Sequence, residues 1–180
     1  MEENGIHERS TGMSASPQAL REALVALLPR LRRFARALAR DVHDADDLVQ
    51  IAAERALTRS GQLRPDAPLS SWMFGIVRNA WLDELRARGR RARVFAPEEG
   101  AERVGDASQG AHAETLAVQD ALARLPEEQC EAVALVLIEG FSYKEAAHIM
   151  EVPIGTLTSR LARGREALQE MLDESGGTRR

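Results

Sequence analysis

The spacing of the apolar residues constrains this chain more than any other feature of its sequence. Wherever a pattern exists, apolar residues recur at steps of three and four, as in Leu31, Phe34, Ala35 and Leu38, which places them on one face of a helix. No stretch alternates apolar and polar residues as a half-buried strand does. Ala, Leu, Arg and Glu are abundant, and these residues lose little side-chain freedom in a helix. The sequence therefore predicts an all-α protein.

Helix breakers divide the first half of the chain. Ser16-Pro17 marks a helix start, and Pro29 interrupts the pattern and is expected to start a new helix. The next helix begins near Asp44, whose side chain is expected to cap the free amides, and Gly61 stops it. A loop with two prolines follows at residues 63–68. Ser70 or Ser71 is then expected to cap a long helix that extends to about Arg88.

The periodicity fails from Val94 to about Ala113, where Gly, Ala, Glu and Pro dominate, and it resumes near Glu114. This composition predicts a flexible acidic linker. A further helix opens at Leu125-Pro126-Glu127-Glu128 and ends at Gly140. We therefore expect two small helical domains joined by this linker, with a disordered tail at 1–15, a first domain at 16–93, the linker at 94–118 and a second domain at 119–174.

The second domain carries a helix-turn-helix pattern. Ser142 and Glu145 form a capping box at the start of a short helix that ends at Met150, and a turn at Glu151-Val152-Pro153 leads into a last helix from Ile154 to about Leu172. Leucines on one stripe of this last helix should pack inward. The residues that then face outward, or lie at the two margins, are Thr156, Ser159, Ala162, Arg163 and Glu166, with Thr158 and Arg160 at the margins.

These outward residue types suit a reader of the DNA major groove. Arg can make bidentate bonds to guanine, while Ser and Thr hydroxyls adapt to several bases. Arg165 is expected to meet phosphate, which adds affinity without sequence information. A merely solvated Arg-rich face is the alternative for each single arginine.

The long helix of the first domain has a second candidate face. Its polar residues are Ser71, Gly75, Arg78, Asn79, Asp83 and Arg86, with Trp72 at the edge. Such a face can bind nucleic-acid backbone and stack a displaced base, and the basic run at residues 86–93, which includes Arg90, would hold phosphates nearby. Core packing is the alternative for both tryptophans. It is favoured for Trp81 and evenly balanced for Trp72.

The net charge of −4 conceals an asymmetry that also favours nucleic acid. Residues 21–93 carry fifteen Arg against nine acidic residues, whereas residues 94–128 carry two basic residues against eight acidic ones. A polyanion meets local patches and not the average charge. The basic block therefore remains a candidate nucleic-acid surface.

Several function classes are not supported by the sequence. The single Cys130 and the four histidines have no metal-ligand spacing, so we expect no metal and no cofactor. No nucleophile is paired with a base and no Gly-rich loop could cradle phosphate, which argues against an enzyme and a small-molecule substrate. No apolar run approaches the roughly 20 residues of a membrane helix, and the acidic start is not a secretory signal. We expect a soluble, cytoplasmic protein without a membrane partner.

Several motifs, in order along the chain, resemble the extracytoplasmic-function (ECF) group of sigma factors. They are Asp44-Ala45-Asp46-Asp47-Leu48-Val49-Gln50, Ser71-Trp72-Met73-Phe74-Gly75-Ile76-Val77-Arg78-Asn79, Leu125-Pro126-Glu127-Glu128-Gln129, Gly140-Phe141-Ser142-Tyr143-Lys144-Glu145-Ala146-Ala147 and Val152-Pro153-Ile154-Gly155-Thr156-Leu157-Thr158-Ser159-Arg160-Leu161. The resemblance spans roughly residues 18–172. It implies a bacterial protein that binds core RNA polymerase, through the clamp of the largest subunit and the flap, and directs it to promoters.

The resemblance also implies roles for residues. The polymerase clamp would contact Asp44, Asp47, Leu48 and Gln50. Residues 63–69 and the helix from Trp72 would open the −10 element, through Leu63, Trp72, Arg78, Asn79, Asp83, Arg86 and Arg90. The −35 element would be read by Thr156, Thr158, Ser159, Arg160, Arg163 and Arg165. The acidic linker would thread through the nucleic-acid channel of the polymerase, and an anti-sigma factor would control the protein. Thr158 and Ala162 stand where many relatives carry Arg or Lys, which leaves the −35 sequence open.

Two other functions remain as alternatives. A stand-alone helix-turn-helix regulator would bind duplex DNA without polymerase, but it would leave the motif at residues 44–50 and the Trp72 helix without a role. Such regulators usually dimerise, and no heptad seam is visible. A helical interaction protein would make the recognition face accidental.

Overall fold

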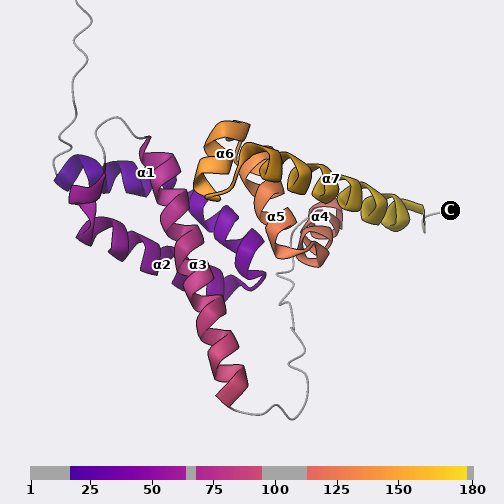
Figure 1. Ribbon diagram of the computed structural model, residues 1–180, viewed down its shortest axis with the longest axis horizontal. Coiled ribbons are helices and arrows are strands. Elements are labelled where there is room, and N and C mark those ends of the chain that lie inside the picture. Colours follow the sequence, from indigo (N-terminus) through magenta and orange to yellow (C-terminus); the bar gives the residue numbers. More distant parts are fainter. Residues whose placement is uncertain (1–16, 64–67, 95–112, 178–180) are drawn as a thin grey trace, which may run out of the picture.

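The computed structural model describes residues 17–63, 68–94 and 113–177. The expected tail, the loop residues 64–67 and most of the expected linker lie outside this part of the chain. The described residues form helices and no strand, which confirms the all-α prediction (Figure 1). The elements are α1 (Pro17–Ala39), α2 (Val42–Thr58), the short 3-10 helix η1 (Ser60–Gln62), α3 (Leu69–Val94), α4 (Ala113–Arg124), α5 (Glu127–Val133), the π-helical segment η2 (Ala134–Ile138), α6 (Tyr143–Ile149) and α7 (Ile154–Gly177).

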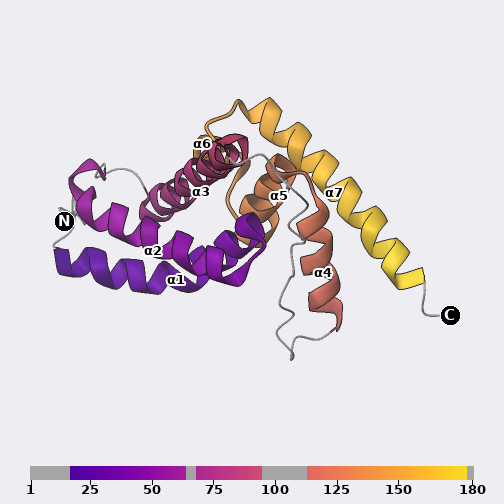
Figure 2. The ribbon, with the colours of Figure 1, turned by 90° about the horizontal axis from the view of Figure 1, so that it is seen from below.

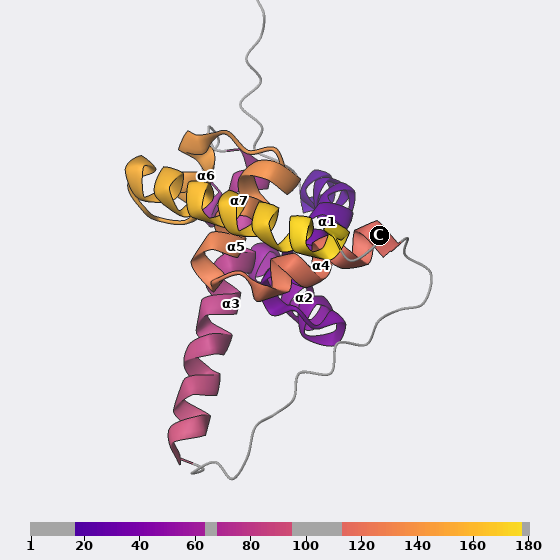
Figure 3. The same ribbon diagram turned by 90° about the vertical axis from the view of Figure 1, so that its right-hand side faces the viewer.

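The first module, α1 to α3, packs its helices around one apolar core. Helices α1 and α2 lie side by side (Figure 2), and Arg40, at a φ of 60°, reverses the chain between them. Phe34, Met73 and Phe74 are fully buried where α3 crosses this pair. The last turns of α3 extend away from the other helices (Figure 3). The basic run predicted at residues 86–93 therefore lies on a projecting arm.

Pro29 does not start a new helix, and that prediction is wrong. Helix α1 continues through it. Proline removes one backbone donor, but the ring of Pro29 lies on the exposed side of α1, whereas Leu24, Leu31 and Phe34 are buried before and after it. Packing along one continuous apolar face therefore outweighs the local break.

The predicted helix caps of the first module also need correction. The N-cap of α2 is Asp41, whose side chain accepts a hydrogen bond from the Asp44 amide at 2.9 Å, so Asp44 does not cap the helix. Helix α3 already begins at Leu69 and continues to Val94, beyond Arg88. The hydroxyl of Ser71 is buried and has no hydrogen-bond partner in the described structure, so it is no cap either.

The second module, α4 to α7, begins earlier than expected, because α4 starts at Ala113, inside the range predicted as linker. Pro126 precedes α5 and Gly140, at a φ of 75°, follows the helical run, as predicted. The run is not uniform. In η2 the Glu139 amide donates to the Ala134 carbonyl, five residues back, which is the π pattern.

The two modules pack against each other. Helix α6 contacts α3, while α4, α5 and η2 contact α1. The rings of Phe34 and Phe74 lie 5.1 Å apart, and Phe141 of the second module meets Phe74 edge-on at 4.8 Å. All three rings are buried. One apolar core therefore runs through both modules.

Candidate nucleic-acid interface

Helices α6 and α7 form the helix-turn-helix. The capping box is confirmed, because the Ser142 hydroxyl accepts from the Glu145 amide and the Glu145 carboxylate accepts from the Ser142 amide at 2.9 Å. The Ser142 hydroxyl also donates to the Glu145 carboxylate at 2.6 Å, and this bond, followed by the one from the Ser142 amide, lowers the pKa of the Glu145 carboxyl. Glu151 takes a φ of 54° in the turn, and the Val152 amide donates to the Ala147 carbonyl. The turn thus directs α7 across α6.

The inward face of α7 is built by Leu157, Leu161 and Gly164, all buried. A Cβ atom on Gly164 would lie 2.8 Å from Cγ2 of Val133 and 3.2 Å from the carbonyl oxygen of Gln129. Only a glycine fits where α7 crosses α5 this closely. This contact fixes the rotation of α7 and therefore the direction of its outer face.

The outer face of α7 carries the residues that sequence reasoning selected for duplex DNA. Ser159 and Arg163 are exposed, and Thr156 and Thr158 are half-buried. The hydroxyl of Thr158 donates to the Ile154 carbonyl at 2.7 Å and that of Ser159 to the Thr156 carbonyl at 3.0 Å. Because each hydroxyl donates its proton to a carbonyl of its own helix, its oxygen remains available on the outer side to accept a hydrogen bond.

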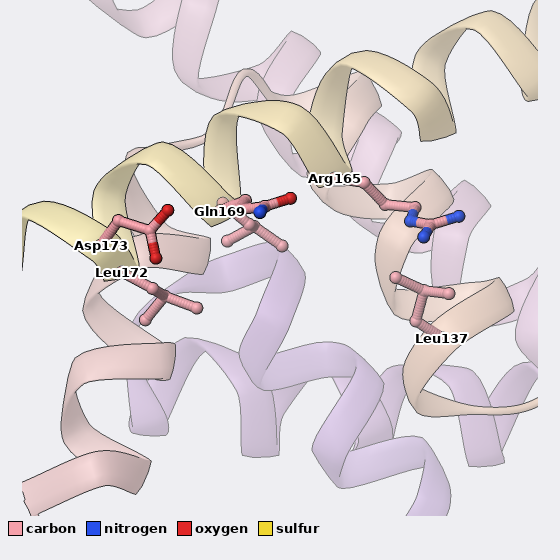
Figure 4. A pocket seen from close by; sticks show the side chains of 6 residues that line it. Leu137, Arg165, Gln169, Leu172 and Asp173 are labelled. Carbon is pink, nitrogen blue, oxygen red and sulfur yellow. The ribbon is translucent and has the colours of Figure 1, made fainter. Parts of the chain in front are cut away.

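The other two arginines predicted to read the −35 element, Arg160 and Arg165, have different surroundings from Arg163. Arg160 forms an ion pair with Glu128 at 2.8 Å. Arg165 flanks a shallow groove of about 320 Å³ between η2 and α7, together with Leu137, Leu168, Gln169, Leu172 and Asp173 (Figure 4). Leu137 is 52% exposed there. The structure therefore separates Arg165 from the face that holds Ser159 and Arg163.

The predicted −10 residues on α3 divide into exposed and covered ones. Asn79, Arg86 and Arg90 are exposed, and Asp83 is exposed while bonding to Arg55 on α2 at 3.0 Å. Leu63 and Trp72 pack partly against the core. The side chain of Arg78 is only 12% exposed, because it is paired with Glu131 of α5.

Trp81 is buried, in agreement with the core packing that the sequence favoured, and it also makes polar contacts. Its indole N–H donates to the Glu127 carboxylate of the second module, and the Arg88 guanidinium lies 5.5 Å from the ring centroid. Arg88 in turn donates to Asp44 at 2.8 Å and to Glu84 at 2.9 Å. The hydrogen bonds raise the pKa of Arg88, with Asp44 as the main cause, and the bond from Arg88 lowers the pKa of Glu84.

The predicted polymerase-binding residues lie on α2. Asp47 and Gln50 are exposed, and Gln50 donates to Glu54 at 3.2 Å. Asp44 is half-buried in its pair with Arg88. Leu48 is 4% exposed, so it supports α2 from the core and does not present its side chain to a partner.

Sequence reasoning missed three carboxylates at the contact between the modules. Glu127 accepts from Trp81, Glu131 pairs with Arg78, and Glu139 binds Arg30 and Arg33 of α1. The helix-start pattern explained Glu127 locally as a first-turn acid. No local signal distinguishes the other two from solvated glutamates, because their partners are distant in the sequence.

Glu131 and its neighbour Cys130 are buried by this contact. Burial raises the pKa of Glu131 to about 7, although Arg78 and, more weakly, Arg160 act in the opposite direction and Glu127 adds to the rise. Burial also raises the pKa of the Cys130 thiol to about 11. Its sulfur lies 3.3 Å from the Ala37 carbonyl of the first module.

Within residues 17–63, 68–94 and 113–177, no group of three or more His, Cys, Asp or Glu side chains is placed to hold a metal ion. In the same part of the chain, no helix has the length and apolar character to cross a membrane.

This fold defines a helical protein with a helix-turn-helix module, and comparison with known proteins places it further. The family model for Sigma-70 region 2 matches residues 24–91, and that for Sigma-70, region 4 matches residues 115–168. The chain belongs to the ECF sigma factors of the sigma-70 family, which are transcription initiation factors.

Curated relatives and a solved structure support this assignment. The ECF RNA polymerase sigma factor EcfG of Rhodopseudomonas palustris is 36% identical over 158 residues, which cover 88% of this chain and 87% of that protein. SigM of Mycobacterium tuberculosis is 41% identical over 175 residues, which cover 93% and 87%. The sigma factor RpoE of Bartonella quintana, solved with the anti-sigma factor NepR, has a TM-score of 0.79 at 32% identity over 87% of this chain and 98% of that chain.

Proposed function

We propose that this sigma factor reads the −35 element as duplex DNA with α7 and opens the −10 element with α3, while α2 holds core RNA polymerase. The observation that carries the proposal is the capped helix-turn-helix, whose recognition helix leaves Ser159 and Arg163 exposed. We place the first domain at α1 to α3 and the second at α4 to α7. The chain acts without a catalytic site of its own, in the cytoplasm.

At the −35 element, Arg163 is the residue best placed for a base edge. It is exposed on the outer face, near the outward-facing hydroxyl of Ser159, and a bidentate Arg–guanine pair contributes about 1–3 kcal/mol of discrimination. Thr156 and Thr158 lie nearby as adaptable partners. Arg160 must leave Glu128 to reach DNA, and Arg165 serves phosphate from the side of the groove.

At the −10 element, exposed polar residues of α3 continue onto its basic arm. Asn79 and Arg86 are available to a single strand, and Arg90 adds a phosphate contact. Trp72 lies at the start of α3 and is partly exposed, so its ring could stack on an extruded base. Asp83 holds Arg55 and Arg86 in place.

On α2, the exposed Asp47 and Gln50 form the polymerase contact, and Asp44 joins them when it releases Arg88. Asp47→Ala should weaken binding to core polymerase severalfold or more, because a charged hydrogen-bonding group is lost. Asp120→Ala, at an exposed position of α4, is a matched control and should bind like wild type. Equal binding of both variants would contradict the assignment of α2.

An anti-sigma factor is the regulatory partner that we propose. The support is the similarity to RpoE, which was solved in complex with NepR and whose chain is matched over 98% of its length. A cognate anti-sigma protein should bind the purified chain and suppress its transcription activity in proportion to the amount added.

Transcription from a library of double-stranded promoter fragments tests the function directly. With core polymerase, the chain should initiate from a defined subset of fragments. Arg163→Ala should reduce initiation about tenfold and relax preference at one −35 position, whereas Arg124→Ala, also exposed on α4, should not. No initiation, together with tight duplex binding by the chain alone, would support the stand-alone regulator instead.

A further inference from the structure

One acidic side chain lies in the polar row of α3 that the proposed function assigns to the −10 strand. Asp83 is exposed between Asn79 and Arg86, and a lone carboxylate there would repel a phosphate backbone. This carboxylate is paired, however. Its Oδ2 accepts from Nη1 of Arg55 on α2 at 3.0 Å, and its Oδ1 lies 3.4 Å from Nη1 of Arg86. With two arginines against one carboxylate, the three side chains together carry one positive charge.

Arg55 differs in position from the other charged residues of α2. It is the one arginine of this helix, whose acidic residues are Asp44, Asp46, Asp47 and Glu54. Because successive residues of a helix point about 100° apart, Arg55 does not share the exposed side that holds Glu54. Its side chain bonds across to α3, against which α2 packs. Arg55 therefore belongs to the edge of α3 that we assign to DNA and not to the acidic side of α2 that we assign to polymerase.

Both guanidinium groups remain accessible to a further anion. The Arg55 side chain is 31% exposed and that of Arg86 is 68% exposed. Each guanidinium has several N–H donors, and the contact with Asp83 engages Nη1 of each. A phosphodiester group carries one negative charge and accepts hydrogen bonds from arginine in a fork geometry. Its charge therefore balances the positive charge of the three side chains.

The shared carboxylate also determines where the two cations lie. Two guanidinium groups repel each other when no anion lies between them, and long arginine side chains lose rotamer freedom when they are held in one place. Asp83 counteracts both effects, because it holds one arginine from each of two packed helices. The two arginines are thus arranged before a strand arrives, which reduces the entropy that binding costs.

We propose that Arg55 and Arg86 together bind one phosphate of the −10 strand, and that Asp83 is a positioning residue that holds them without contacting the strand. This inference rests on the proposed function of α3. It adds Arg55 of α2, which no sequence motif indicated, to the residues that bind nucleic acid. It also extends the path of the strand from α3 onto α2.

The competing interpretation is an ion pair that only joins α2 to α3. Exposed pairs of this kind contribute little to stability, so DNA binding separates the two interpretations. The assay measures binding of a fluorescein-labelled single-stranded DNA of about 12 nucleotides and mixed sequence to the full chain. Fluorescence anisotropy is recorded from about 20 to 200 mM KCl, because each phosphate contact with a single strand contributes about 0.7 to the slope of log affinity against log salt.

Three substitutions of arginine test the phosphate contact. Arg55→Gln should weaken binding about three- to tenfold and lower the salt slope by about 0.7. Arg55→Lys retains a positive charge and should keep the salt slope of wild type. Arg124→Gln, at an exposed position of α4, is the matched control and should change neither quantity. All three variants should melt like wild type by circular dichroism, so a loss of binding does not reflect unfolding.

Asp83→Asn tests the positioning role. Loss of a negative charge would by itself tighten DNA binding, whereas loss of the positioned arginines should weaken it, and we expect weaker binding. In the Asp83→Asn background, Arg55→Gln should reduce the affinity by less than about twofold, because Arg55 is no longer held at the strand. Non-additivity of this kind identifies residues that act together.

The outcomes separate this proposal from the function on which it rests. If Arg55→Gln has the affinity and salt slope of wild type while Arg86→Gln binds more weakly, the role of Arg55 is overturned and the function of α3 stands. Tighter binding by Asp83→Asn would overturn the positioning role of Asp83. If wild type binds the oligonucleotide no better than the double variant Asn79→Ala with Arg86→Ala, the function of α3 is overturned, and this phosphate site with it.

Discussion

The close crossing of α5 and α7 at Gly164 gives a prediction that can be worked out from distances. In Gly164→Ala, the new methyl carbon would lie 2.8 Å from Cγ2 of Val133 and 3.3 Å from Cβ of Gln129. Carbon atoms pack best at about 3.5–4.0 Å. Val133 cannot turn aside easily, because a β-branched side chain in a helix has essentially one rotamer. The two helices must therefore separate.

A matched glycine isolates the size of this effect. A Cβ on Gly75 in α3 would have no atom within 4 Å, so Gly75→Ala should gain about 1 kcal/mol from helix propensity alone. Gly164→Ala has the same gain but also an overpacking cost of about 1–3 kcal/mol. Because propensity cancels, the free energy of unfolding should differ between the two variants by about 1–3 kcal/mol, with Gly164→Ala the less stable.

Urea unfolding followed by far-UV circular dichroism measures this difference, and hydrogen exchange of α5 and α7 amides locates it. Protection should fall in those two helices in Gly164→Ala and remain unchanged there in Gly75→Ala. If the two variants differ by less than about 0.5 kcal/mol, α5 and α7 can move apart freely, and the argument that Gly164 fixes the rotation of α7 is refuted.

Three further predictions concern stability. Ser142→Ala removes the capping box and should cost about 1 kcal/mol in urea unfolding; no loss would mean that water replaces the hydroxyl. Glu151→Gly relieves a φ of 54° and should raise the melting temperature by a few degrees, about 1 kcal/mol, whereas a lower melting temperature would reveal a stabilising contact of the side chain. Burial raises the pKa of Glu131 from 4.5 to about 7, so between these values the folded chain binds more protons than the unfolded one. Stability from this group should thus be full below about pH 4.5, decline as the pH rises to about 7 and then level off. Glu131→Gln should flatten that decline in urea titrations across this range, and an unchanged slope would contradict the assignment.

Local signals predicted much of the fold and of the recognition helix. Ser142 and Glu145 are three residues apart and satisfy each other's amides, so their pattern required no knowledge of the rest of the chain. The leucine stripe of α7 likewise depends only on helical spacing. The predictions for Pro29 and Asp44 were wrong because two local possibilities competed at each position. The continuous apolar face of α1 outweighed the effect of the proline, and Asp41 was an equally suitable cap for α2.

The contact between the modules could not be predicted in this way. Arg30 and Glu139 are 109 residues apart, and nothing near either residue indicates the other. The same limit applies to the candidate site. The helical wheel placed Arg78 on a polar face, which is correct for an isolated helix, but it could not show that Glu131 would cover it. Leu48 was selected through a motif, and only the three-dimensional packing reveals that it lies inside.

Because of the π-helical turn of η2, the contact between the modules depends on the number of residues in this segment as well as on their types. Its hydrogen bond from Glu139 to Ala134 encloses one residue more than an α-helical turn would. Loss of a single residue between 134 and 138 would restore a regular α-helix and turn Glu139 away from Arg30 and Arg33, with every charged group retained. We therefore expect that homologous chains with a one-residue deletion in this segment also lack the arginines at the positions of Arg30 and Arg33.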